Sequence, residues 1–275
     1  MSKHQISIII PVLNEVEIIG DLLKHLIANT DTDTLAEIIV VDGGSTDGTL
    51  DILRPTRFQK PSRSDMNSKS TKSLDCTRPD ITLISNERNA ESSSALENHS
   101  KILFINSPKG RAKQMNLGAK EAKGNILYFL HADSSPPKNF NQLIINEVQK
   151  GNSAGCFRMQ FDSAHWWLKL ASWFTQFSWR ACRGGDQSQF ITRVLFNEIG
   201  GYDENYIIYE DNILINELYA RNQFVVINKK IKTSARLYKK HGVWKVQYHF
   251  WTIYVKKWFG ASAADLLAYY HRHIR

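Results

Sequence analysis

The 275-residue sequence lacks any run of about 18 apolar residues, which excludes a membrane-spanning helix. Its first apolar stretch is short and ends at Pro11, so we expect no signal peptide and predict a cytoplasmic protein. Cysteine is scarce as well: Cys76, Cys156 and Cys182 form no CxxC pair, which argues against a disulfide framework and a zinc site. The glycine motifs GxGxxG and GxxxxGKS/T are also missing, so neither a dinucleotide site nor a P-loop is indicated.

Acidic residues are outnumbered, with 27 Asp and Glu against 35 Lys and Arg, so the formal net charge is +8. Residues 54–79 carry seven basic against two acidic side chains, and residues 236–275 carry eight against one. With +5 and +7 in these two segments, the remainder of the chain has a net charge of −4. Because the excess lies in one polar segment and one tail, we expect no nucleic-acid partner.

Short β-branched runs alternate with amphipathic segments through the first half of the chain. The pattern predicts strands at 6–10, 37–41 and 125–130, helices at 15–28 and 111–123, and a short helix ending near Leu53. Residues 81–84 and 101–105 each have the composition of a further strand. This alternation predicts an α/β fold with a mainly parallel central sheet and helices on both faces.

Two segments depart from this pattern. Residues 55–100 are rich in Ser, Asn, Lys and Thr and poor in large apolar residues, so we predict a flexible polar insert within a domain of residues 1–235. Residues 236–275 form a basic, aromatic tail that we expect to be helical.

All seven tryptophans lie between Trp166 and Trp258. Residues 165–179 place aromatic and aliphatic side chains at helical spacing, and Trp244, Trp251 and Trp258 recur every seven residues. Two interpretations stay open: aromatic-rich helices packed on the sheet, or an amphipathic helix that rests on lipid headgroups with the help of nearby lysines.

Loops that follow the predicted strands carry the residues with chemical potential, and open α/β sheets bind ligands at that edge. In the loop at 11–15, Asn14 can cap the following helix. The paired glycines at 42–49 allow close backbone approach, and Asp42 can accept hydrogen bonds from a base or a ribose. Asp133 can ligate a hard cation, and Asp211 can act as a general base. Each loop also has a purely structural interpretation as a helix cap or turn.

The order and spacing of six motifs are more specific than any single loop. IIIPVLNE, VVDGGSTDGT, GRAKQMNLGA, FLHAD, GGYDE and YED span residues 5–221, interrupted by the insert. Together they resemble the family 2 glycosyltransferases, which have a Rossmann-like sandwich of the GT-A type. The segment DQSQFITRVLFNEIGGYDE, with Ser234, Ala235 and Arg236, is most similar to a bacterial subgroup of carotenoid-acid glucosyltransferase-like proteins.

The resemblance assigns roles to residues of this chain. Asp211, with Glu210 before it, matches the catalytic base, and Asp133 matches the metal-binding last acid of the DxD motif, with Mg²⁺ or Mn²⁺ as its cation. The expected acceptor pocket contains Gly200, Gly201 and Tyr202. The expected donor-binding residues are Pro11, Asn14, Glu15, Asp42, Gly43, Ser45, Arg111, Asn116, His131 and Asp133. Gly43 and His131 stand where many relatives have a further acid.

The resemblance implies an inverting, metal-assisted hexosyltransferase that moves a sugar from a nucleotide-diphosphate sugar to an acceptor hydroxyl or carboxyl group. One alternative is a peripheral transferase on the inner face of the cell membrane, acting on a lipid such as a polyprenyl phosphate or a carotenoid acid. Another is a non-catalytic nucleotide-sugar-binding protein. The leading interpretation requires that Asp133 and Asp211 face a single crevice.

Overall fold

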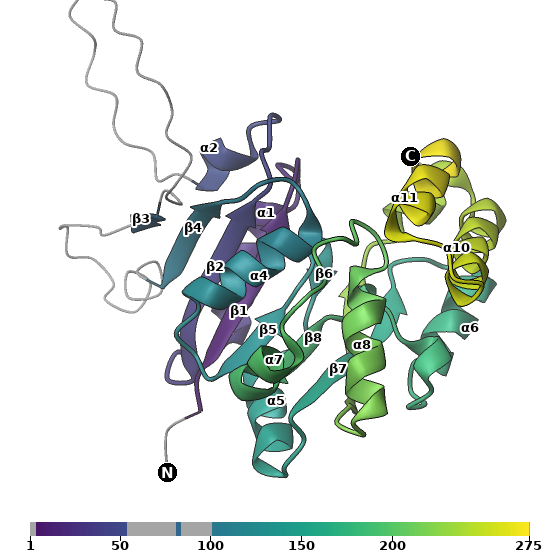
Figure 1. Ribbon diagram of the computed structural model, residues 1–275. Helices are drawn as coiled ribbons and strands as arrows, with labels where there is room; N and C mark the ends of the chain where they lie inside the picture. Colours follow the sequence, from purple (N-terminus) through teal and green to yellow (C-terminus); the bar gives the residue numbers. More distant parts are fainter. Residues whose placement is uncertain (1–3, 54–80, 84–100, 275) are drawn as a thin grey trace, which may run out of the picture.

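The computed structural model describes residues 4–53, 81–83 and 101–274 (Figure 1). The predicted flexible insert at 55–100 lies outside these residues, apart from the strand at 81–83. The helices and strands otherwise follow the predicted alternation. None of the helices in the described part of the chain has the length and hydropathy of a membrane span.

One sheet runs through the described residues, in the strand order β3-β4-β2-β1-β5-β8-β7-β9-β6. Strands β1, β2, β4 and β5 pair in parallel, whereas β8 is antiparallel to both of its neighbours, β5 and β7. The α/β class is therefore confirmed. The run β4-β2-β1-β5 is parallel, the edge strand β3 is antiparallel to β4, and the pairing beyond β5 is mixed. The strands are β1 (Ile6–Val12), β2 (Leu35–Asp42), β3 (Ile81–Leu83), β4 (Ile102–Asn106), β5 (Ile126–Phe129), β6 (Ser134–Ser135), β7 (Ala154–Phe161), β8 (Gln189–Thr192) and β9 (Val225–Thr233).

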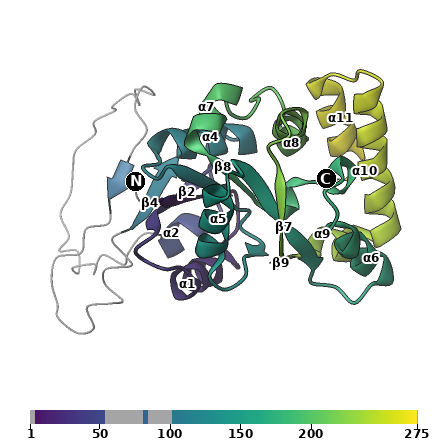
Figure 2. The same ribbon diagram turned by 90° about the horizontal axis from the view of Figure 1, so that it is seen from below.

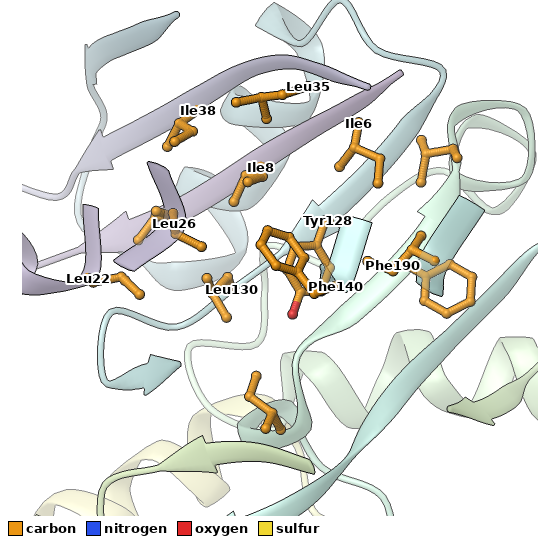
Figure 3. Close-up of a cluster of buried hydrophobic side chains, with 14 of the residues drawn as sticks. Ile6, Ile8, Leu22, Leu26, Leu35, Ile38, Tyr128, Leu130, Phe140 and Phe190 are labelled. Carbon is orange, nitrogen blue, oxygen red and sulfur yellow. The ribbon is translucent and has the colours of Figure 1, made fainter. Parts of the chain in front are cut away.

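Helices cover both faces of the sheet because successive side chains of the central strands are buried on opposite sides (Figure 2). Ile8 packs with α1 and α5 in one hydrophobic cluster (Figure 3), and its neighbour Ile9 packs with α4, α7 and α8 in another. The helices are α1 (Ile19–Asn29), α2 (Thr49–Leu53), α4 (Arg111–Glu121), α5 (Phe140–Gln149), α6 (Trp166–Phe174), α7 (Arg193–Ile199), α8 (Glu210–Ala220), α9 (Arg236–His241), α10 (Val243–Trp258) and α11 (Ala263–His273).

Several boundaries differ from the predicted ones, each for a local reason. Helix α1 begins four residues later than expected because residues 15–18 belong to the loop after β1, where the Glu15 and Val16 N–H groups donate to Thr49 and Asp47. Helix α6 ends at Phe174, not at 179, because the hydroxyl of Thr175 bonds to the backbone of Met159 and Ser172.

Candidate active site

The predicted loops meet at one edge of the sheet because β1, β2 and β5 run in parallel and end together. The loops after β1 and β2 are bonded to each other. The Asn14 amide N–H donates to Ser45 Oγ at 2.8 Å, and Asn14 Oδ1 accepts from the Thr46 N–H at 2.8 Å. The buried Asp42 carboxylate accepts from the backbone N–H groups of Gly44 and Ser45. These hydrogen bonds hold the loops at 11–15 and 42–49 together at the edge of the sheet, and we call these two loops the shelf.

Gly43 stands where many relatives have a second acid, and the structure gives the reason for a glycine. A Cβ atom at this position would lie 3.1 Å from the side-chain amide of Gln114. The Gln114 amide is itself fixed, because it donates to the carbonyl oxygens of Val12 and Val41 at 2.8 and 2.7 Å. A buried glutamine therefore occupies the space that a side chain at 43 would need.

Two acids at the start of α8 lie against the first residue of α4. Glu210 and Asp211 are both buried, and Arg111 Nη1 lies 3.1 Å from Glu210 Oε1 and 3.9 Å from Asp211 Oδ2. The backbone of Tyr209, with φ 73°, turns the chain so that both carboxylates open the helix. The structure thus brings together three of the predicted site residues.

Asp211 is enclosed on its other sides by His131 and Gly185. His131 Nε2 lies 3.9 Å from Asp211 Oδ2, and a Cβ atom on Gly185 would lie only 1.9 Å from the same oxygen. Only glycine fits at 185 with the carboxylate in this position. The next residue, Asp186, has a 58% exposed side chain, and its Oδ1 lies 3.7 Å from His131 Nδ1.

Neither Gly185 nor Asp186 was among the predicted site residues. The pair belongs to the short sequence GGDQ at 184–187, which lies at a distance from every predicted strand end. A glycine pair beside an acid is the signal that could have drawn attention to this segment.

Burial and charge shift the protonation of this cluster. Burial foremost, and then Glu210, raise the pKa of Asp211 well above its usual value, against the opposing effect of Arg111. Burial, followed by Arg111, lowers the pKa of His131 well below its usual value. His131 is therefore neutral near pH 7, and its contacts with Asp186 and Asp211 are not ion pairs.

Asp133 follows β5 in a more open setting. Its Oδ2 lies 3.8 Å from Nε of Arg236, the first residue of α9, and Arg236 also forms a two-pronged ion pair with Glu15. Burial raises the pKa of Asp133, and Arg236 opposes that shift. Asp133 lines two cavities of about 670 and 380 Å³, neither of which has Asp211 among its lining residues, so a single crevice shared by the two acids stays a prediction. Arg111 and Asp186 each interact electrostatically with both Asp133 and Asp211.

The described residues can hold a divalent cation only together with the phosphates of a substrate. Among residues 4–53, 81–83 and 101–274, no three His, Cys, Asp or Glu side chains converge on one point, so the protein by itself forms no complete cage. Mg²⁺ is commonly held by one or two carboxylates together with substrate phosphates, and the partly exposed Asp133 fits that mode.

Four further predicted residues have structural contacts. Asn116 on α4 accepts from the Tyr202 N–H and donates to its carbonyl, both at 2.9 Å. Gly200 and Gly201 adopt positive φ angles of 90° and 80° at the end of α7. The ring of Tyr202 is buried edge-on against Phe129, with centroids 5.0 Å apart. Asn116 thus ties the turn at 200–202 to the helix that carries Arg111.

A family model described as "Glycosyl transferase family 2" matches residues 7–64 and 69–210, which is most of the chain. The chain belongs to glycosyltransferase family 2. The match includes both loops of the shelf, Arg111, Asp133 and the segment 184–187. No curated protein sequence gives a significant match, so the carotenoid-acid subgroup stays a prediction.

Solved structures of glycosyltransferases share the GT-A fold of this family member. The mannosyltransferase PcManGT from Pyrobaculum calidifontis, in complex with GDP-Man and Mn²⁺, aligns with a TM-score of 0.59 at 16% identity, over 99% of this chain and 65% of that chain. S. aureus TarS 1–349 with UDP aligns with a TM-score of 0.57 at 15% identity, over 84% of this chain and 60% of that one. The chain therefore spans less than two thirds of the length of either protein, and the likeness shows the fold alone.

Proposed function

We propose that the chain moves a sugar from a nucleotide-diphosphate sugar to an acceptor hydroxyl or carboxyl group with inversion, and that Asp211 is the general base. The enclosure of Asp211 carries this proposal. Arg111 and His131 each lie 3.9 Å from its Oδ2, and Gly185 leaves room for the carboxylate. Burial raises its pKa well above the usual value, closer to the pH at which a base is most effective.

A hydroxyl acceptor reacts in a single displacement. The Asp211 carboxylate takes the proton of the acceptor hydroxyl, and the oxygen forms a bond to the anomeric carbon. The bond between that carbon and the diphosphate oxygen breaks, and its electron pair leaves with the nucleoside diphosphate. Attack on the opposite face inverts the anomeric centre. Arg111 offsets negative charge beside Asp211 throughout.

The donor lies on the shelf formed by residues 11–15 and 42–49 in this proposal. Support comes from the hydrogen bonds that pre-form the two loops, and from the nucleotide-sugar complexes of proteins with this fold: GDP-Man in PcManGT and UDP-GlcNAc in TarS. Asp133 would hold Mg²⁺ or Mn²⁺, and the bound cation would supply charge neutralisation at the departing diphosphate. PcManGT was solved with Mn²⁺.

A lipid acceptor is the second candidate, because the cavity beside Asp133 extends to the chain entering α6, whose aromatic side chains are exposed. A transferase of this kind would lie on the inner face of the cell membrane. The non-catalytic alternative is disfavoured by Asp211. A buried carboxylate with a raised pKa costs folding stability, and nucleotide binding alone gives no use for it.

A screen of UDP-, GDP- and dTDP-sugars with Mg²⁺ or Mn²⁺, measured as hydrolysis and transfer, tests this function. With the active donor, Asp211→Asn should keep nucleotide-sugar binding and lose roughly 10²–10⁴-fold in turnover. Glu198→Gln, an exposed change on α7, is the control and should keep full activity. Unchanged turnover in Asp211→Asn would remove this residue from the role of base.

A further inference from the structure

Six of the seven tryptophans have large exposed fractions, although tryptophan is normally mostly buried. They belong to α6, the turn after it, and α10. We call this surface the aromatic face; its residues are Trp166, Trp173, Trp179, Trp244, Tyr248, Trp251, Trp258 and Phe259. Single exposed apolar residues are ordinary, but a contiguous apolar patch marks an interaction site.

The two helices join their aromatic side chains into one surface. The Trp244 ring lies 5.8 Å from the ring of Trp166 and 5.3 Å from that of Trp167, and Trp167 also reaches Trp251 at 5.9 Å. Figures 1 and 2 show α6 and α10 side by side at the end of the molecule opposite β3 and β4. Residues seven apart lie on one side of a helix, so Trp244, Trp251 and Trp258 extend the patch along α10.

The exposed rings are not a core left incomplete, because both helices have a separate buried stripe. Leu168 of α6 is fully buried with Phe161 and Ala235, and the ring of Phe161 meets that of Tyr238 at 5.3 Å. On α10, Ile253 is buried against Leu266 of α11. The aromatic face is therefore held rigidly on its inner side and left open on its outer side.

Basic side chains predominate around this face. Residues 162–186 and 236–265 together contain nine Lys and Arg against three Asp, and one of the nine, Arg183, is buried. Tryptophan and tyrosine are enriched at membrane–water interfaces, and basic residues beside them attract anionic headgroups. Cores of protein–protein interfaces, in contrast, are depleted in lysine.

We propose that the aromatic face docks on an anionic lipid bilayer, with its rings at the boundary between headgroups and acyl chains. Trp258 and Phe259 are the deepest contacts, because they are 85% and 83% exposed at the end of α10. The exposed Lys240 of α9 and Lys245 of α10 lie at headgroup level. The surface combines two segments far apart in sequence, so the tail from 236 onward supplies only part of it.

The cavity beside Asp133 extends to the residues that precede α6, next to this surface. Its lining runs from Asp133 through Asp162, Ser163 and Ala164, which lead into α6, and it includes Lys239 on α9. An acceptor anchored in the bilayer can therefore reach Asp133 without leaving the membrane. This part of the inference rests on the proposed function and deepens it: the acceptor is a lipid whose reactive headgroup enters this cavity.

Co-sedimentation of the full chain with vesicles tests the docking surface. Binding is expected to vesicles of phosphatidylcholine mixed with phosphatidylglycerol, and to weaken in high salt and on phosphatidylcholine alone. The double variant Trp258→Ala with Phe259→Ala should bind about tenfold or more weakly, because two apolar side chains lose their burial. The matched control is Val194→Ala on α7, which removes an exposed apolar side chain from another part of the surface and should bind normally.

Charge reversal separates the electrostatic contribution to vesicle binding from the apolar one. Lys240→Glu with Lys245→Glu should weaken binding to anionic vesicles by roughly twentyfold or more, at about fivefold per lost basic residue. Lys120→Glu with Lys123→Glu makes the same charge change at the end of α4 and should have a much smaller effect. Equal losses in both pairs would show non-specific attraction by net charge and would overturn the docking surface.

Absence of vesicle binding by the unaltered chain overturns the proposal. So does a stable dimer in solution that dissociates in the Trp258→Ala, Phe259→Ala variant. Nucleotide-sugar binding by the same protein samples keeps this failure distinct from that of the proposed function. A chain that binds the donor but no vesicles retains the transferase function and loses the membrane surface. A chain that binds vesicles but no nucleotide sugar retains the membrane surface and loses the transferase function.

Discussion

Asp133, which follows β5, and Asp211, in the first turn of α8, have very different surroundings. Asp211 is enclosed by Arg111, His131 and Gly185 and lines neither cavity, whereas Asp133 lines both cavities and pairs with an arginine that is half exposed. Enclosure raises the pKa of Asp211 and fixes its direction, which suits proton transfer. Openness leaves Asp133 accessible to ions and phosphates, which suits binding. The difference predicts that the two acids respond to different perturbations.

The largest effect is expected at the enclosed acid. In Gly185→Ala, the new methyl group would meet the Asp211 carboxylate at 1.9 Å and displace it. We expect a loss of roughly 10²–10⁴-fold in turnover, comparable to the loss of a positioned base, with nucleotide-sugar binding retained. Steady-state kinetics and donor titration on the same protein measure both quantities.

Gly184→Ala is the matched control. Gly184 has an extended backbone, with φ −165°, and a Cβ atom there would meet nothing within 4 Å. Its activity should stay close to that of the unaltered chain. An equal loss in both variants would show that flexibility of the glycine pair, and not enclosure of Asp211, limits turnover.

The open acid should respond to the cation. Asp133→Ala is expected to weaken Mn²⁺-dependent nucleotide-sugar binding by at least about tenfold, and to leave binding measured in a chelator unchanged. Asp211→Asn should leave both titrations unchanged. If Asp133→Ala binds the donor normally with Mn²⁺, the metal role of this residue is wrong and only a structural role remains.

The enclosed acid should also make stability depend on pH. Because its folded pKa is raised above the unfolded value, Asp211 favours the folded state fully at pH below its unfolded value, and this contribution is lost as pH rises through the folded pKa. Asp211→Asn lacks this loss. Thermal melts should show the variant gaining about 2–4 °C or more over the unaltered chain between about pH 5 and about pH 8.

Asp162→Asn, a change of the same kind at an exposed carboxylate, is the control and should show no such gain. A constant difference between Asp211→Asn and the unaltered chain across this pH range would contradict the raised pKa.

The smallest effect is expected at Arg236, the basic side chain beside Asp133. Arg236 is half exposed, so its ion pair with Glu15 is screened by solvent. Arg236→Gln should reduce the free energy of unfolding by no more than about 1 kcal/mol, and by less in high salt. Denaturant melts at two salt concentrations measure this. A much larger loss would mean that Arg236 anchors α9, and with it the aromatic face.

Much of the N-terminal half was predictable because its signals are local. The β-branched runs at 6–10 and 37–41 lie in the parallel strands β1 and β2, and strands predicted to be parallel must end at one edge. The loops holding Asn14 and Asp42 were therefore predicted in the right place. The hydrogen bonds that join them depend on side-chain geometry that spacing alone does not contain.

The enclosure of Asp211 was not predictable, because it joins four segments far apart in the chain. Gly185 follows no predicted strand, and its need for glycine arises from a side chain 26 residues later. The pairing of Asp133 with Arg236 has the same origin. Local patterns also missed the end of α6, since Thr175 bonds to a neighbouring strand.

The hydrogen bonds between Asn116 and the backbone of Tyr202 restrict when this part of the protein can fold during synthesis. The Asn116 amide holds the backbone of a residue 86 positions later, so this contact forms only once the chain has emerged well past residue 202. Contacts between such distant residues form slowly and late. A growing chain can therefore join the loops at 11–15 and 42–49 early, whereas the turn at 200–202 is tied to α4 only later.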